Sequence, residues 1–132
     1  MTLKKTDAKS QLKSNLGQKI AITVFNDRIS ARFDCFHRMI ILTYDPPSQQ
    51  YQRQELTIMD MSPYEKINLL EELNIDTLIC GGMLPICDGY LALKGVKTIS
   101  WITGNAEEVI QLYLDGKLTP TQGRGNTRGK NE

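Results

Sequence analysis

The pattern of apolar and polar positions predicts alternating strands and helices between residues 18 and 118. Residues 20–25 form a continuous run of β-branched and apolar side chains, which is typical of a central strand covered on both faces. Residues 38–44 and 51–59 predict two further strands, and the segment between them, residues 45–50, is rich in turn residues. These two strands should therefore form an antiparallel hairpin.

Three helices are predicted from capping signals and from the spacing of apolar residues. Ser62, Pro63 and Glu65 form a capping box with proline at the first helical position, which starts the first helix. The second helix covers residues 84–94 and ends at a glycine. The third begins after Asn105, which is a good N-cap residue.

Two short strands, residues 77–80 and 96–102, alternate with these helices, so the element order is β-β-β-α-β-α-β-α. Helical crossovers join parallel strands, which predicts an α/β fold with a five-stranded mixed sheet in the order 3-2-1-4-5, flanked by three helices. In that order the connections leave strands 1 and 4 in opposite directions. The crevice beyond their carboxyl ends is then the expected ligand site, where residues 26–37 and 80–85 should meet.

Charge is distributed unevenly along the 132 residues, although the net charge is only +1. Residues 1–17 hold four lysines against one aspartate, and residues 117–132 hold four basic residues against one acid. The segment between them holds eight basic and thirteen acidic side chains. We therefore expect one folded domain over residues 18–118, with flexible basic extensions at 1–17 and 119–132. The extensions either contact an acidic partner or only keep the chain soluble.

The composition also indicates a compartment and excludes some classes of protein. The chain has three cysteines, an odd number, and no apolar run approaching the roughly 18 residues of a membrane span. Its first residues lack the apolar segment of a signal peptide. We expect a soluble, cytoplasmic protein with reduced thiols. The small net charge argues against a strongly basic nucleic-acid binder.

The two loops at the predicted crevice carry most of the unusual side chains. The first loop, residues 26–37, offers Arg28 and Arg32 for an anionic ligand and Asp34 as a carboxylate. The second loop contains two consecutive glycines, residues 81–82. Such a pair is typical both of a tight turn into a helix and of a backbone cradle for an anion.

The candidate metal ligands are the three cysteines and the single histidine. Cys35 and His37 end the first loop, Cys80 closes a strand, and Cys87 lies one turn into the following helix, where the helix field favours a thiolate. Their spacings match no established zinc pattern. Cys80 and Cys87 can equally be small core residues, and His37 can be an ordinary surface histidine.

Several segments together resemble the dinitrogenase iron-molybdenum cofactor biosynthesis family, small proteins similar to NifX and to the C-terminal domain of NifB. The segments that carry the resemblance are residues 19–34, 79–82, 94–99, 101–109 and 115–118. The resemblance covers about 100 residues. It implies a ribonuclease H-like fold and the binding or carriage of iron-sulfur or iron-molybdenum cluster precursors during cofactor assembly.

The resemblance also indicates where the cargo would bind. The family segment Gly-Arg-Ile/Val-Ser/Ala-x-x-Phe-Asp corresponds to residues 27–34, with Asp27 at the glycine position, and a Cys/Gly-Gly-Gly segment corresponds to residues 80–82. The candidate cargo-binding residues are Asn26, Arg28, Ser30, Arg32, Asp34, Gly81 and Gly82. The candidate metal ligands are Cys35, His37, Cys80 and Cys87.

The expected function is therefore that of a carrier rather than an enzyme, because an incomplete and mixed ligand set suits transient holding. Its expected partners are metallocluster donor and acceptor proteins, without nucleic acid or membrane, and the chain should be a monomer or weak dimer. The alternative is a metal-free module that binds a small anion or a partner protein in the same crevice. A nuclease of the ribonuclease H type is disfavoured, because residues 19–25 contain no carboxylate to hold Mg²⁺.

Overall fold

An open, mixed six-stranded sheet forms the centre of the computed structural model, which describes residues 18–45, 47–48 and 50–118. The strands are β1 (Lys19–Phe25), β2 (Arg28–Ile29), β3 (Arg38–Asp45), β4 (Gln50–Thr57), β5 (Thr77–Ile79) and β6 (Lys97–Ile99). The main path of the sheet is β4-β3-β1-β5-β6, and β2 pairs with β1 beside this path. The predicted extensions, residues 1–17 and 119–132, lie outside the described residues.

The strand directions confirm the predicted hairpin and the parallel crossovers. β3 is antiparallel to both β1 and β4, whereas β1, β5 and β6 run parallel to one another. The carboxyl ends of these three parallel strands therefore meet at one end of the sheet.

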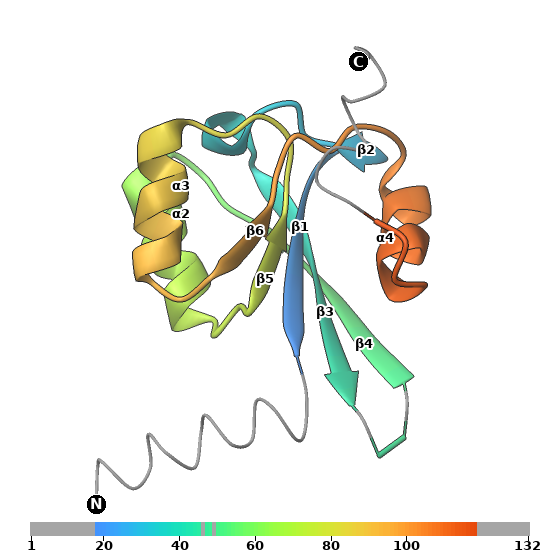
Figure 1. The fold of residues 1–132 in the computed structure, drawn as a ribbon. Coiled ribbons are helices and arrows are strands. Elements are labelled where there is room, and N and C mark those ends of the chain that lie inside the picture. The colour runs from blue at the N-terminus through green and yellow to red at the C-terminus, as the bar shows by residue number, and fades with distance from the viewer. Residues whose placement is uncertain (1–17, 46, 49, 119–132) are drawn as a thin grey trace, which may run out of the picture.

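Helices cover both faces of the sheet (Figure 1). α2 (Pro63–Glu72) and α3 (Pro85–Leu93) lie on one face, and α4 (Ala106–Leu114) lies on the other. Alternate residues of β1 enter the two cores: Ala21 packs in the α2 and α3 layer, whereas Ile20 and Ile22 pack in the α4 layer. This two-sided burial explains why the sequence of β1 is continuously apolar.

The predicted caps fix where the helices begin. In α2, the Ser62 hydroxyl accepts from Glu65 N at 3.2 Å, and the Glu65 carboxylate accepts from Ser62 N at 2.7 Å. In α4, the Asn105 side chain accepts from Glu108 N at 3.1 Å. None of the helices in the described part of the chain has the length and apolar character needed to cross a membrane.

Some predicted boundaries were wrong, and two short elements were missed. The strand expected over residues 96–102 ends at Ile99, because the backbone turns to a positive φ of 65° at Trp101. The strand expected over residues 51–59 ends at Thr57. The loop 26–37 contains β2 and the 3-10 turn η1 (Phe33–Cys35), neither of which was predicted.

Candidate functional site

The two loops predicted to meet at the crevice do meet, and their backbones are bonded directly. Phe33 N donates to Gly82 O at 2.8 Å, and Gly82 N donates to Ala31 O at 2.7 Å. A Cβ at Gly81 would lie 2.2 Å from Ser30 O, which is impossible without moving the backbone. Gly81 is therefore required for the close approach of the two loops, and a Cβ at Gly82 would be a tight fit, 3.2 Å from Ala31 O.

The contact between the loops argues against the interpretation of the glycine pair as an anion cradle. Gly82 N–H is already bonded to Ala31 O, so it does not point toward a ligand. Gly81 is buried against the first loop. The carbonyl oxygens of Ser30 and Ala31 occupy the position that a Cβ atom of residue 81 would need. The pair joins the two loops, a role that neither alternative drawn from the sequence had described.

Beside this joint lies a cavity of about 290 Å³. It is lined by Ala31, Arg32, Asp34, Gly82, Met83, Leu84 and Trp101. Most of these side chains are apolar, and the volume is close to the lower end of ordinary small-ligand pockets. The cavity is at the carboxyl ends of the parallel strands, where α/β sheets commonly bind ligands.

Trp101 forms one wall of the cavity and was missed as a site residue. Its amide donates to Gly81 O at 2.8 Å, and its indole lies so close to Gly82 that a Cβ there would be 3.4 Å from the ring. The side chain is 48% exposed. Because residues 96–102 were predicted as one strand, the turn that brings this indole to the cavity could not be anticipated.

The polar rim of the cavity is an ion pair between Arg32 and Asp34. Arg32 Nε lies 3.0 Å from Asp34 Oδ1, and Nη2 lies 2.7 Å from Oδ2. The hydrogen bond and the charge of Asp34 raise the pKa of Arg32. Arg28 is exposed, and its side chain has no ion-pair partner within the described residues. Of the two predicted anion-binding arginines, Arg28 therefore keeps the less compensated charge.

A buried lysine, also missed, supports the turn that carries this rim. Lys66 on α2 is buried, and its Nζ donates to Asp34 O at 2.9 Å and lies 4.7 Å from the centroid of the Phe36 ring. Burial lowers the pKa of Lys66. Lysines on a helix usually face water. The spacing of apolar residues along α2 therefore did not predict that Lys66 is buried next to η1.

The three cysteines divide into one exposed and two buried thiols. Cys35 is exposed on η1, whereas Cys80 and Cys87 are buried in the core beneath α2 and α3. Burial raises the pKa of Cys80 to about 12 and also raises that of Cys87. At Cys87, desolvation opposes the thiolate that the helix field was expected to favour. Both buried thiols fit the core alternative.

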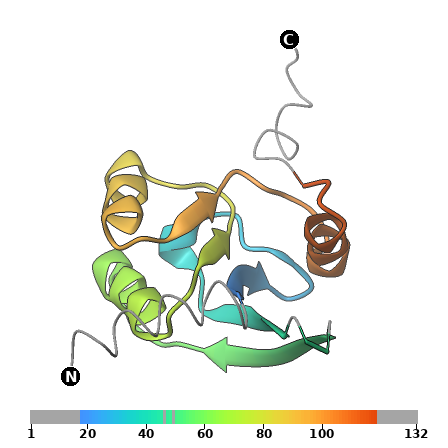
Figure 2. The ribbon, with the colours of Figure 1, turned by 60° about the horizontal axis from the view of Figure 1, so that its bottom comes forward.

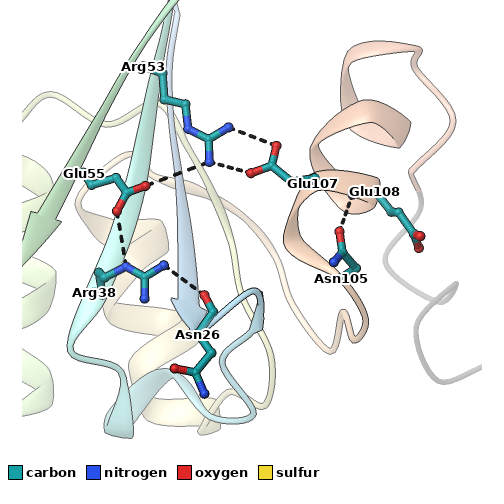
Figure 3. A network of polar contacts seen from close by, with 7 residues as sticks. All are labelled: Asn26, Arg38, Arg53, Glu55, Asn105, Glu107 and Glu108. Carbon is teal, nitrogen blue, oxygen red and sulfur yellow. Dashed lines mark hydrogen bonds and ion pairs between the residues drawn. The ribbon is translucent and has the colours of Figure 1, made fainter.

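The remaining candidates lie in the first loop but are not gathered into a metal site. His37 is exposed, and Asn26 is exposed with its carbonyl accepting from Arg38 Nη2 at 2.9 Å (Figure 3). Ser30 is buried, and its hydroxyl donates to Arg32 O at 3.3 Å. Among the described residues, no three His, Cys, Asp or Glu side chains lie together as a metal site would require.

Comparison with known proteins identifies the fold but no family. No family model and no curated protein matches the chain. A protein of Methanocaldococcus jannaschii provisionally named a dinitrogenase has a TM-score of 0.62 at 18% identity, covering 79% of this chain and 94% of its own. The apo form of the orange protein from Desulfovibrio gigas has a TM-score of 0.59 at 18% identity, covering 80% of this chain and 94% of its own.

A third solved structure is a Thermotoga protein provisionally named NifB, with a TM-score of 0.56 at 25% identity. The match covers 85% of this chain and 98% of that protein. The three likenesses show that the chain shares its fold with these proteins, one of which is provisionally named NifB.

Proposed function

We propose that the chain is a carrier for iron-sulfur or iron-molybdenum cluster precursors, which it receives from a donor protein and passes to an acceptor. The observation that carries the proposal is the cavity at the carboxyl ends of β1, β5 and β6, with an ion pair on its rim. The fold shared with proteins provisionally named a dinitrogenase and NifB supports this cargo. The sheet order β4-β3-β1-β5-β6 supports assigning the fold to the ribonuclease H-like type.

The side chains present limit how such a cargo would be held. Cys80 and Cys87 are buried in the core, and burial raises the pKa of both thiols, so they are less available to iron than an exposed thiol. The exposed candidates are Cys35 and His37, both on or next to η1. Two ligands are too few for a permanent cage, and they suit a cluster that keeps its own sulfide or other ligands and is later released.

Charge supports the same proposal. Cluster precursors of this class are anionic, and Arg28 lies on the first loop outside the cavity wall, with no ion-pair partner among the described residues. Arg32 already pairs with Asp34, so it contributes less net positive charge but holds the rim in place. The proposed role of the protein itself is to bind, shield and release the cargo, without a catalytic step.

The alternative is a metal-free module that binds a small anion or a partner protein in the same cavity. The specific observation in its favour is that two of the three thiols belong to the core. An apolar wall formed by Met83, Leu84 and Trp101 would suit an organic anion or an apolar side chain of a partner.

Anaerobic reconstitution distinguishes the two. Wild-type protein is incubated with iron and sulfide and desalted, and bound iron is measured together with the visible absorption spectrum. We expect retained iron with thiolate-to-iron charge-transfer bands, lost in Cys35→Ser and kept in the control Cys87→Ala, which leaves the exposed thiol intact. Equal iron in Cys35→Ser and wild type would remove Cys35 as a ligand. No retained iron in wild type would favour the metal-free module.

A further inference from the structure

The outer edge of β4 is unusually open for a strand at the margin of a sheet. Figure 2 shows β4 at this margin with no coloured element beyond it. The strand at the opposite margin, β6, has three residues, whereas β4 has eight, all paired in continuous register with β3. Proteins commonly protect long edges with charged side chains, above all lysine, or with proline or a bulge. β4, with the sequence QYQRQELT, has no lysine, proline or bulge, and its only charged residues are Arg53 and Glu55.

The hydrogen-bonding pattern fixes which residues of β4 face outward. Just beyond the strand, Ile58 N donates to His37 O at 2.7 Å, in the same register as the β3–β4 pairs. Bonded and non-bonded pairs alternate along an antiparallel ladder, so the even-numbered residues of β4 bond to β3. The outward backbone groups belong to the odd-numbered residues, which are Tyr51, Arg53, Glu55 and Thr57. In the described part of the chain, these groups have no backbone partner.

We propose that β4 pairs with β4 of a second copy of this chain, antiparallel about a two-fold axis at Gln54. This register places Arg53 of each copy opposite Glu55 of the other. The outward N–H and C=O groups of the odd-numbered residues in one copy then face those of the other copy and can bond to them. A shift of one step in either direction would place Arg53 opposite Arg53, or Glu55 opposite Glu55. Like charges directly opposite each other are destabilising, so charge favours the register about Gln54 over both of its neighbours.

The ion pairs of the single chain fit the proposed dimer. Arg53 and Glu55 both lie on the face toward α4, where Arg53 bonds Glu107 at 2.9 Å and Glu55 lies 3.3 Å from Arg38 (Figure 3). Pairing about Gln54 would join the two charge networks across the interface. The contact uses the same patch on both copies, so it closes as a dimer and does not extend into a filament.

Sedimentation equilibrium over a range of concentrations tests the dimer. We expect wild-type protein to approach twice the 14.9 kDa of one chain. Gln54→Lys places two like charges at the axis and should return the mass to that of one chain. Gln111→Lys, an exposed site on α4, is the matched control and should behave as wild type. A wild-type protein that stays at the mass of one chain, or a Gln54→Lys variant that dimerises equally well, would overturn the proposal.

Disulfide cross-linking tests the register. In a Cys35→Ser background, which removes the exposed thiol, Gln54→Cys brings two thiols together at the axis as a non-hydrogen-bonded pair. The Cα spacing of such a pair, about 4.5 Å, allows a disulfide. Gln52→Cys is the control, since residue 52 would face Leu56 of the second copy. With oxidised glutathione, we expect a covalent dimer from Gln54→Cys and at most a tenth as much from Gln52→Cys. Equal yields, or no covalent dimer from Gln54→Cys, would refute the register.

Discussion

At the scale of single residues, the joint between the two loops depends on Gly81 having no side chain. We expect Gly81→Ala to lower the free energy of unfolding by about 1–3 kcal/mol, since its Cβ would meet Ser30 O and Ala31 O at 2.2 and 2.6 Å. Gly89→Ala is the matched control, because the residue is inside α3 and its Cβ would meet nothing within 4 Å beyond its chain neighbours and the backbone of its own helix. It should stabilise by about 0.5–1 kcal/mol. Urea unfolding measures both, and equal shifts would contradict the tight contact.

Thiol reactivity is a second residue-scale prediction. In native protein at pH 8, we expect iodoacetamide to modify Cys35 quickly and to leave Cys80 and Cys87 unmodified, because the buried thiols are both inaccessible and protonated. Mass spectrometry of peptides identifies the modified residue. Unfolded protein, in which all three react, is the control. Rapid native modification of Cys80 would show that the core opens readily at this point.

The raised pKa of Cys80 also predicts a pH dependence of stability. Between pH 9 and about 12 the unfolded chain loses the Cys80 proton while the native state keeps it. The free energy of unfolding should therefore fall with rising pH, by at most about 1.4 kcal/mol per pH unit from this group. Urea unfolding at several pH values measures the slope. Cys80→Ala should show a shallower slope, because the other titrating groups affect both proteins alike. Identical slopes in the two proteins would contradict a raised pKa of Cys80.

At the scale of elements, the caps are where sequence and structure agree in detail. Ser62→Ala should destabilise the protein by about 1 kcal/mol, because Glu65 N loses its acceptor at the start of α2. Ser62→Asp keeps an acceptor at the same position and serves as the control. Thermal or urea unfolding measures the difference. A loss of the same size in Ser62→Asp would mean that the hydroxyl acts through something other than the cap.

The elements also show how far the sequence could predict this protein. β1, the hairpin and the three helices have strong local signals, such as the apolar run of β1 and the caps at Ser62 and Asn105. β2 and η1 have two and three residues, too few for any periodicity to appear. The meeting of the two loops was predicted correctly, whereas Trp101 and Lys66 were not predicted to lie beside them. The burial of Cys87 and Lys66 and the turn at Trp101 depend on packing between elements distant in sequence.

At the scale of the whole molecule, the fold separates two surfaces. The cavity lies at the carboxyl ends of the parallel strands, among the loops that follow β1, β5 and β6. The open edge of β4 runs along the side of the sheet (Figure 2). No residue of β4 lines the cavity, and the side chains of Arg32 and Asp34 pair with each other rather than with β4. Binding of cargo and pairing of chains should therefore be separable.

That separation gives the last prediction. Gln54→Lys should abolish dimerisation while it leaves iron retention at the wild-type level, and Cys35→Ser should do the reverse. Trp101 is the single tryptophan and lines the cavity, so its fluorescence reports binding in both variants. β4 contains no tryptophan that would add to this signal. Sedimentation equilibrium, iron analysis and fluorescence titration on the same preparations measure all three properties. Loss of iron in Gln54→Lys would mean that the cavity needs the second copy, and the two surfaces would then act as one.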